Sequence, residues 1–240
     1  VIFIVVMKIT VLREELNKAL NLVSRVVPAR PNIPVLANVL ITAGKTGLEL
    51  AATNLETSIK IKIAAKTELE GSTTAPAKVL TDFVGNSKEE SLEISLNKEN
   101  LEIVSKQAKA ILATINPMEF PQLPKIGSSD GEEVLGSDLI DGINRVVFAA
   151  SVDESRPILT GVLFKSAPEG LALVATDGYR LAMKTTAIKL KTADLVVPAR
   201  SLQEVAKLIG DTDTDKVRVA VLEGNNQILF SGQNFEIATR

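Results

Sequence analysis

Hydrophobic and polar residues alternate along this chain with two different periods. Residues 7–11 alternate one by one, which is typical of a half-buried β-strand. After them an apolar residue recurs every three or four positions, which predicts an amphipathic helix with an inward-facing stripe. This stripe consists of Leu16, Ala19, Leu20, Val23 and Val26. The sequence therefore predicts that the fold begins with a strand followed by a helix.

A matching helix is predicted near the middle of the chain. Its apolar stripe consists of Leu139, Ile143, Val146, Val147 and Ala150. Ser137 and Asp138 stand at its start, where serine is a favoured N-cap and an acid favours the positive end of the helix dipole. We therefore expect Ser137 to cap this helix and Asp138 to lie in its first turn.

Short alternating segments follow each of these helices and predict strands. They are residues 35–43, 48–52 and 57–64 in the first half, and 159–166, 171–175 and 182–188 in the second. Each half then has a second helix, 78–85 or 200–209, and ends in a hairpin, 92–115 or 217–239, that turns at 97–100 or 223–226. Two helices per half are too few for a parallel sheet, so each half is predicted to be α+β, with two helices on one side of antiparallel sheet.

The two halves are copies of one plan. Residues 34–40 match 157–163, and residues 47–53 match 170–176, at the same offset of 123 positions. Residues 76–78 and 198–200 continue the match with a drift of one position. A register that holds along the chain indicates a tandem duplication, and therefore two domains.

The duplication also predicts the domain boundaries. We expect a first domain at residues 7–125, a linker at 126–132 and a second domain at 133–240. Residues 1–6 precede Met7, which looks like the natural start, and are interpreted as an upstream or non-native remnant. The second copy stops at Arg240, where the first continues into a proline-rich connector. The sequence is therefore expected to be a fragment.

Composition narrows the possible chemistry. The chain is 45% hydrophobic but only 3% aromatic, so the cores must consist of Leu, Ile, Val and Ala. It has no Cys and no His, which excludes disulfides and thiol nucleophiles and removes the commonest general base and metal ligand. No catalytic residue, metal or cofactor is predicted. With 27 basic and 29 acidic residues, any contact with nucleic acid must be local.

No apolar run is long enough to span a bilayer, and residues 1–6 lack the basic region and cleavage site of a signal peptide. A cytoplasmic location is therefore predicted, with no membrane partner.

Two other motifs are considered and set aside. Residues 211–215 imitate the start of a calcium loop, but Lys216 stands where glycine is needed and Leu222 where a bidentate glutamate is needed. Asp153 and Glu154 could in principle form a hydrolytic pair. Adjacent positions in a loop give no reason to expect facing carboxylates. A carboxylate-dependent hydrolase remains an alternative, as does a protein-interaction module that does not encircle DNA.

The most informative difference between the copies is the turn after the third strand. The first copy has Thr-Asn-Leu-Glu-Thr at residues 53–57, and the second has Thr-Asp-Gly-Tyr-Arg-Leu at 176–181. Asp-Gly between apolar runs is an ordinary hairpin signal. The second copy, however, places the only Tyr of the chain beside an Arg, and both residue types are common in recognition surfaces. A glycine there would also let a ligand approach closely.

These residues carry a resemblance to a known family. Residues 155–162 and 176–182 closely resemble the second domain of the bacterial DNA polymerase III β subunit, the sliding clamp, and residues 7–11, 30–38 and 120–124 resemble its first domain. The resemblance covers residues 7–240. It implies the DNA clamp fold and a non-enzymatic processivity factor in DNA replication. In that family three domains per subunit form a head-to-tail homodimer ring around duplex DNA, so a third domain is absent here.

The resemblance also implies a pocket for partner peptides, which come from the DNA polymerase III catalytic subunit, the clamp loader and other clamp-binding proteins. From this chain the pocket is expected to be lined by Leu159, Thr176, Gly178, Tyr179, Arg180 and Leu181. Some relatives carry His in place of Tyr179. The other wall of the pocket comes from the domain boundary and from the third domain.

For double-stranded DNA, the positions that match the family are Arg30, Lys78 and Arg200. Further basic residues lie on the polar sides of the predicted helices; they are Lys18, Arg25, Arg145 and Lys207. Weak contacts that ignore base sequence suit a protein that slides, because they involve only the phosphate backbone. We therefore expect a modestly basic inner wall built from helices of both copies.

Overall fold

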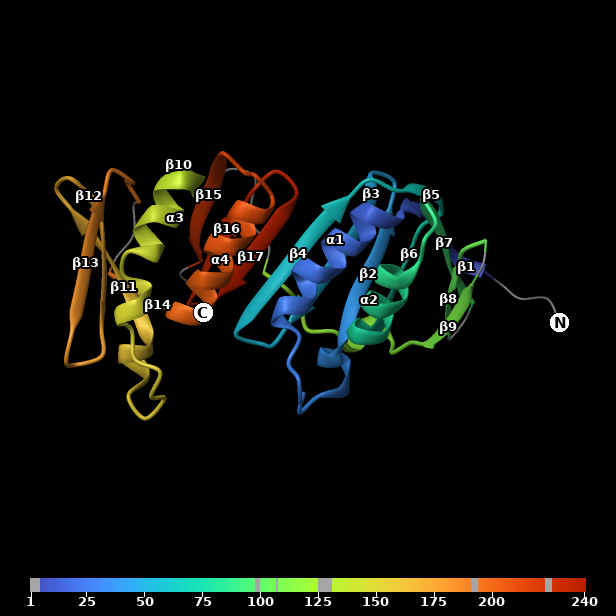
Figure 1. Cartoon of the computed structure of the whole chain (residues 1–240), viewed down its shortest axis with the longest axis horizontal. Helices are drawn as coiled ribbons and strands as arrows, with labels where there is room; N and C mark the ends of the chain where they lie inside the picture. The colour runs from blue at the N-terminus through green and yellow to red at the C-terminus, as the bar shows by residue number, and fades with distance from the viewer. Residues whose placement is uncertain (1–4, 98–99, 107, 125–130, 191–193, 223–225) are drawn as a thin grey trace. The chain divides into compact units, whose positions relative to one another are not determined.

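The computed structural model describes residues 5–97, 100–106, 108–124, 131–190, 194–222 and 226–240. The chain divides into two compact units, Val1–Leu123 and Pro124–Arg240. Each unit has two α-helices and antiparallel sheets (Figure 1). The predicted α+β architecture, with two helices per repeat, is thereby confirmed.

The first unit contains a five-stranded antiparallel sheet in the order β5-β1-β7-β8-β9. Its strands are β1 (Val5–Leu12), β5 (Lys66–Leu69), β7 (Ser91–Asn97), β8 (Asn100–Val104) and β9 (Lys109–Ala113). The predicted hairpin over 92–115 is therefore three-stranded, and β9 lies at the edge of the sheet.

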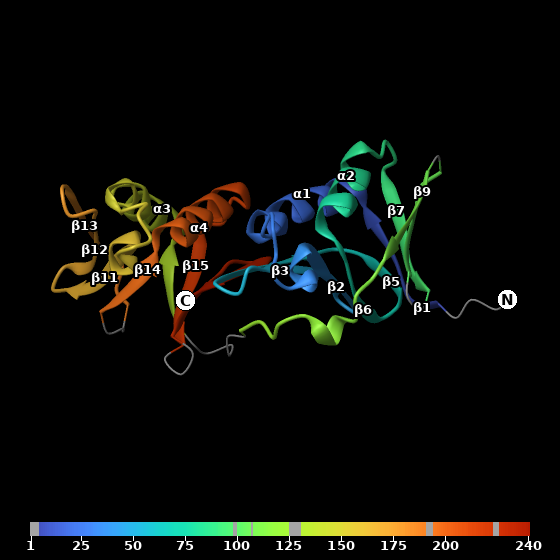
Figure 2. The same ribbon diagram turned by 90° about the horizontal axis from the view of Figure 1, so that it is seen from below.

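Four further strands of the first unit run in the order β4-β3-β2-β6. They are β2 (Asn38–Gly44), β3 (Gly47–Thr53), β4 (Thr57–Ile63) and β6 (Gly71–Pro76). The helices α1 (Arg13–Val23) and α2 (Ala77–Asn86) lie on one side of the strands (Figure 2). The predicted stripe of α1 is buried, and full burial of each leucine stabilises the fold by about 1.5–3 kcal/mol.

The second unit repeats this arrangement with eight strands in two groups. One group, β10-β15-β16-β17, consists of Glu132–Leu135, Lys216–Leu222, Gln227–Ser231 and Phe235–Thr239. The other, β13-β12-β11-β14, consists of Leu181–Thr186, Gly170–Thr176, Gly161–Ala167 and Leu195–Pro198. The helices α3 (Gly136–Asn144) and α4 (Ala199–Asp211) pack against each other.

Short 3-10 helices shorten several predicted elements. They are η1 (Ser24–Val26), η2 (Pro34–Ala37), η3 (Pro117–Glu119), η4 (Val147–Ala149) and η5 (Pro157–Thr160). The strands expected from residues 35 and 159 begin later because a proline starts a 3-10 turn in front of each. The first and third helices likewise end earlier than predicted. Val147 consequently lies half-buried in η4, while Val146 is fully buried.

The predicted N-cap of α3 is wrong. Ser137 lies inside the helix, which begins at Gly136 and has no side-chain cap. The backbone N–H of Gly136 instead donates to the carbonyl oxygen of Asp215, 2.7 Å away, so a neighbouring loop takes the place of a serine cap. Asp138 does lie in the first turn, as expected. The predicted turns at 97–100 and 223–226 fall partly outside the described residues.

Candidate functional site

The turn between β12 and β13 is held by its own side chains. The Thr176 hydroxyl accepts from the N–H of Gly178 at 3.0 Å and donates to the carbonyl oxygen of Arg180 at 2.7 Å. Oδ1 of Asp177 accepts from the N–H groups of Tyr179 and Arg180, both at 2.9 Å. Thr and Asp are favoured in such turns because their short side chains reach the backbone two or three residues on. The turn is therefore stabilised by the side chains of its own residues, in addition to the pairing of β12 with β13.

The matching turn of the first unit, between β3 and β4, has the same bonds. The Thr53 hydroxyl accepts from the N–H of Leu55 and donates to the carbonyl oxygen of Thr57. Oδ1 of Asn54 accepts from the N–H groups of Glu56 and Thr57. The duplication thus preserves these four hydrogen bonds. The first turn has in addition a bond from the backbone N–H of Asn54 to the carbonyl oxygen of Thr57, and the two turns display different side chains.

The backbone explains the glycine of the second turn. Gly178 has a φ of 93°, and Leu55 at the matching position has a φ of 75°. Positive φ is costly for leucine and free of strain for glycine. No heavy atom lies within 4 Å of the Cβ that Gly178 lacks, so open space lies beside it. The glycine therefore relieves backbone strain and also leaves room for a ligand.

Arg180 is held in place by two neighbours. Its Nε donates to Oδ2 of Asp177 at 2.9 Å, and its guanidinium carbon lies 5.8 Å from the centre of the Phe148 ring, within cation–π range. The N–H groups of Arg180 and Tyr179 hold the pKa of Asp177 below its ordinary value, so this carboxylate is charged at neutral pH. The terminal guanidinium nitrogens are left for a ligand.

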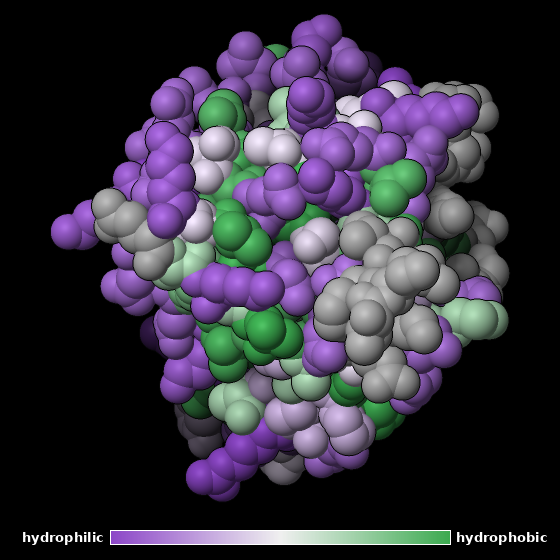
Figure 3. Space-filling view, turned by 90° about the vertical axis from the view of Figure 1, so that its right-hand side faces the viewer, coloured by the Kyte–Doolittle hydropathy of each residue, from purple (hydrophilic) through white to green (hydrophobic). Residues whose placement is uncertain are grey.

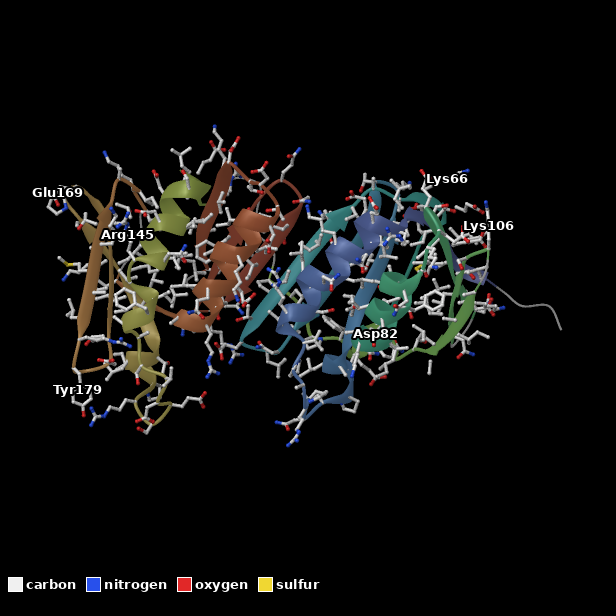
Figure 4. All side chains as sticks on the ribbon, viewed as in Figure 1. Lys66, Asp82, Lys106, Arg145, Glu169 and Tyr179 are labelled. Atoms are coloured by element: carbon white, nitrogen blue, oxygen red, sulfur yellow. The ribbon has the colours of Figure 1, made fainter. Side chains whose placement is uncertain are left out.

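The sheet brings the predicted pocket residues to one end of the second unit. Because β11, β12 and β13 are antiparallel, β11 begins where β12 ends and β13 begins. Leu159 in η5 precedes β11 and therefore lies at the same end as Thr176 and Leu181. Tyr179 is fully exposed and Leu181 is 67% exposed. Figure 4 shows Tyr179 at the tip of this turn.

Sequence reasoning missed three exposed apolar residues in the segment that carries this site. They are Phe148, Val152 and Ile158, and Ile158 is 72% exposed. A signal was available at Phe148, because the matching position of the first copy is the charged Arg25. The N–H of Ser151 donates to the carbonyl oxygen of Leu159 and ties this segment to η5. The apolar surface is therefore broader than predicted.

The predicted DNA-contacting residues of the first unit are exposed. Lys18 lies on α1, Arg25 in η1, Arg30 in the loop after it and Lys78 near the start of α2. Within the described part of the chain, Lys18, Arg30 and Lys78 make no ion pair with an acid. Their charges are therefore open to an external anion.

The predicted DNA-contacting residues of the second unit are exposed but paired. Nε of Arg145, at the end of α3, lies 2.7 Å from Oδ1 of Asp141. On α4, Lys207 lies 2.9 Å from Glu204 and Arg200 lies 3.6 Å from Glu154. Arg145 is the first cause of the lowered pKa of Asp141, to which Lys184 also contributes. The two units therefore present different charge to a polyanion.

The two acids of the hydrolase alternative are not arranged as a catalytic pair. Both carboxylate oxygens of Asp153 accept from Ser155, whose N–H is the main cause of the lowered pKa of Asp153. Glu154 pairs with Arg200 instead. A general acid at neutral pH needs a raised pKa. Among the described residues, no group of three or more acids is placed to hold a metal ion.

Two open hollows of the first unit are lined by described residues. One, of about 500 Å³, lies between the end of α2 and the segment before β9 and is lined by Val79, Phe83 and Ala108 among others. The other, of about 600 Å³, is more polar and lies where β6, β8 and β9 approach the segment after β9. Among the described helices, none is both long and apolar enough to cross a membrane.

The two units match two consecutive family models. Residues 7–124 match the N-terminal domain of the DNA polymerase III beta subunit, and residues 133–240 match its central domain. Together with the tandem repeat and the shared turn, these matches define the class as proteins built from repeated α+β domains of the DNA polymerase III beta subunit type. The chain belongs to the DNA polymerase III beta subunit family.

Individual relatives agree with this assignment. The chain is 38% identical to the beta sliding clamp of Synechococcus elongatus, over 93% of this chain and 61% of that protein. The sliding clamp of Bacillus subtilis superposes with a TM-score of 0.90 at 29% identity, covering 98% of this chain and 64% of that one. A Pseudomonas aeruginosa clamp bound to griselimycin gives 0.86 at 28% identity, with the same coverage. The chain thus spans about 61–64% of the length of these relatives.

Proposed function

We propose that this chain serves as part of a DNA polymerase processivity factor, a sliding clamp that encircles duplex DNA and tethers the replicative polymerase. The observation that carries the proposal is the pair of matching turns. They share the same side-chain-to-backbone hydrogen bonds, yet only the turn of the second unit displays a Tyr and an Arg. Family membership supports the same reading. The protein works in the cytoplasm as a non-enzymatic scaffold.

The peptide site consists of the residues at the end of the β11-β12-β13 sheet. In this proposal Leu159 and Leu181 supply apolar surface, Thr176 and Gly178 shape the turn, and Tyr179 and Arg180 are the polar anchors. An apolar groove with a few polar anchors captures an extended peptide over a small area, which suits partners that must exchange. These partners are the DNA polymerase III catalytic subunit, the clamp loader and other clamp-binding proteins.

We propose that griselimycin, with which a P. aeruginosa clamp has been solved, binds this chain at the same site, and it therefore serves as the probe. We expect Tyr179→Ala combined with Arg180→Ala to weaken its binding by roughly thirty-fold, since loss of a hot spot costs at least about 2 kcal/mol. Isothermal titration measures the affinity. Glu56→Ala, at the position of the first unit that matches Tyr179, is the control and should leave the affinity unchanged. Equal affinity in the double variant and the parent would rule out this site.

The ring is proposed to close through the first unit. β9 is an edge strand, and its Ile111 is 58% exposed. Figure 3 looks onto the end of the first unit and shows apolar side chains (green) among polar ones (purple). An edge strand has unpaired backbone groups, and the hollow lined by Val79 and Phe83 adds apolar surface near it. A second subunit would cover both features in the homodimer.

A further inference from the structure

The helices of the two units differ in how their cations are partnered. In the second unit Arg145, Arg200 and Lys207 each lie within 4 Å of an acid, at 2.7, 3.6 and 2.9 Å. In the first unit Lys18, Arg30 and Lys78 have no such partner among the described residues. A cation beside a carboxylate projects little net field beyond a few ångströms, because the two charges cancel.

Alignment of the two copies shows that this difference in charge is already present in the sequence. Lys18, Arg25 and Arg30 of the first copy are matched by Asp141, Phe148 and Asp153 of the second. Two of these positions are thus acidic in the second copy and one is apolar, whereas Lys78 is matched by the basic Arg200. Asp141, on α3, is also the acid that holds Arg145 and contacts Lys184.

The charge of each unit agrees with this local picture. Basic residues outnumber acids by one in residues 1–123, whereas acids outnumber basic residues by three in residues 124–240. A duplex with one phosphate charge per about 1.7 Å of its axis responds to net local charge, because affinity comes from released counterions. The second unit would release few of them.

We propose that the first unit alone supplies the attraction for DNA phosphates, and that Asp141, Glu154 and Glu204 act as built-in counter-ions that keep the second unit from gripping the duplex. This inference rests on the proposed function, since it describes how the same DNA-facing surface is divided. Fewer phosphate contacts then have to break when the protein moves along the duplex, because only the first unit attracts the phosphates.

The experiment compares two matched triple variants of the 240-residue chain. The first-unit variant carries Lys18→Gln, Arg30→Gln and Lys78→Gln, and the second-unit variant carries Arg145→Gln, Arg200→Gln and Lys207→Gln. Each removes three positive charges from exposed positions. Binding to a fluorescent duplex of about 30 base pairs is measured by anisotropy at several salt concentrations below about 0.15 M.

The first-unit variant should make the slope of log affinity against log salt shallower by about 2 to 3, at about 0.9 per lost phosphate contact. The second-unit variant should change it by less than about 1. A third variant, Asp141→Asn with Glu154→Gln and Glu204→Gln, should make the slope steeper. Circular dichroism confirms that each variant is folded.

Two results would overturn the inference and leave the proposed function intact. One is an equal loss of slope in the two cation variants, and the other is an unchanged slope after removal of the three acids. If the parent chain binds the duplex with no salt dependence, the DNA-binding part of the proposed function is wrong, and this inference falls with it.

Discussion

At the residue scale, backbone conformation explains Gly178 before any ligand does. Its φ of 93° is matched by 75° at Leu55, so both turns need a left-handed residue. The sequence alone identified the difference between the turns. It could not separate strain relief from ligand access, because a φ angle cannot be read from a dipeptide. The side chains at Tyr179 and Arg180 remain the functional signal.

Alanine substitution of two glycines separates these effects. Gly178 and Gly210 both have open space where a Cβ would be, but only Gly178 has a positive φ. Gly178→Ala should destabilise the protein by about 1 kcal/mol. Gly210→Ala, inside α4, should stabilise it by about 0.5–1 kcal/mol. Urea unfolding measures both, and a stabilising Gly178→Ala would refute the strain argument.

Asp177 gives the turn a predictable pH dependence. Its folded pKa is depressed by the N–H groups of Arg180 and Tyr179, so its contribution to stability is complete above the ordinary value of 3.8 and is lost as the pH falls toward the lowered pKa. Asp177→Asn should reduce this acid-side loss. Asn54 accepts the same two bonds in the first unit, so the turn should persist while the Arg180 ion pair is lost.

Urea unfolding of the parent and of Asp177→Asn between pH 5 and about pH 2.5 tests this dependence. Identical acid-side slopes in the two proteins would show that the carboxylate does not titrate as described.

At the scale of the element, the periods of the sequence predicted which segments are helical but not where they end. The apolar pattern predicts a helix that reaches Ala150, yet α3 ends at Asn144 and Ala149 is buried in a 3-10 turn. The predicted serine cap of α3 is also wrong. The N–H of Gly136 donates to the carbonyl oxygen of Asp215, in a loop that is distant in the sequence. A tertiary contact of this kind leaves no local sequence signal. The short strands β5, β6, β10 and β14 were missed for a similar reason.

Two neighbouring substitutions test the corrected start of α3. A Cβ on Gly136 would lie 2.4 Å from the carbonyl oxygen of Thr214, so Gly136→Ala should destabilise the protein by about 1–3 kcal/mol. Ser137→Ala should cost less than about 0.5 kcal/mol, whereas loss of a true N-cap costs about 1. Thermal unfolding of the two variants decides between the assignments. A larger loss of stability from Ser137→Ala than from Gly136→Ala would show that Ser137 is the N-cap after all.

At the scale of the whole molecule, the duplication was the most reliable guide. The offset of 123 positions in the sequence corresponds to two units whose helices and strands follow the same order, except that β5 has no counterpart among the described residues of the second unit. The offset also locates matching hydrogen bonds at Thr53 and Thr176. The ion pair between Glu154 and Arg200 could not be predicted, because the two residues are far apart in the sequence and meet only in the fold. The pairs Asp141–Arg145 and Glu204–Lys207 have helical spacings of four and three residues, which the sequence does show.

Ring closure is the prediction that belongs to this scale. The proposed ring needs a third unit, and the chain spans about 61–64% of its relatives, so a polypeptide of these 240 residues should sediment without a closed ring. In a clamp that carries all three units, Ile111→Glu should shift the ring toward monomers, because it places a charge on the proposed interface. Ile111→Gln, which is polar but uncharged at the same position, is the comparison that isolates the charge. A stable ring formed by the 240 residues would contradict the model.

The self-supporting turn has a practical consequence. Its shape is set by Thr53 and Asn54 in one unit and by Thr176 and Asp177 in the other, so the residue at its exposed tip can be exchanged without disturbing the strands. The tip residues of one turn could therefore be replaced with those of the other by mutation. Leu55→Gly combined with Glu56→Tyr would give the first turn the residue types found at Gly178 and Tyr179. Thr57 is buried and would have to stay.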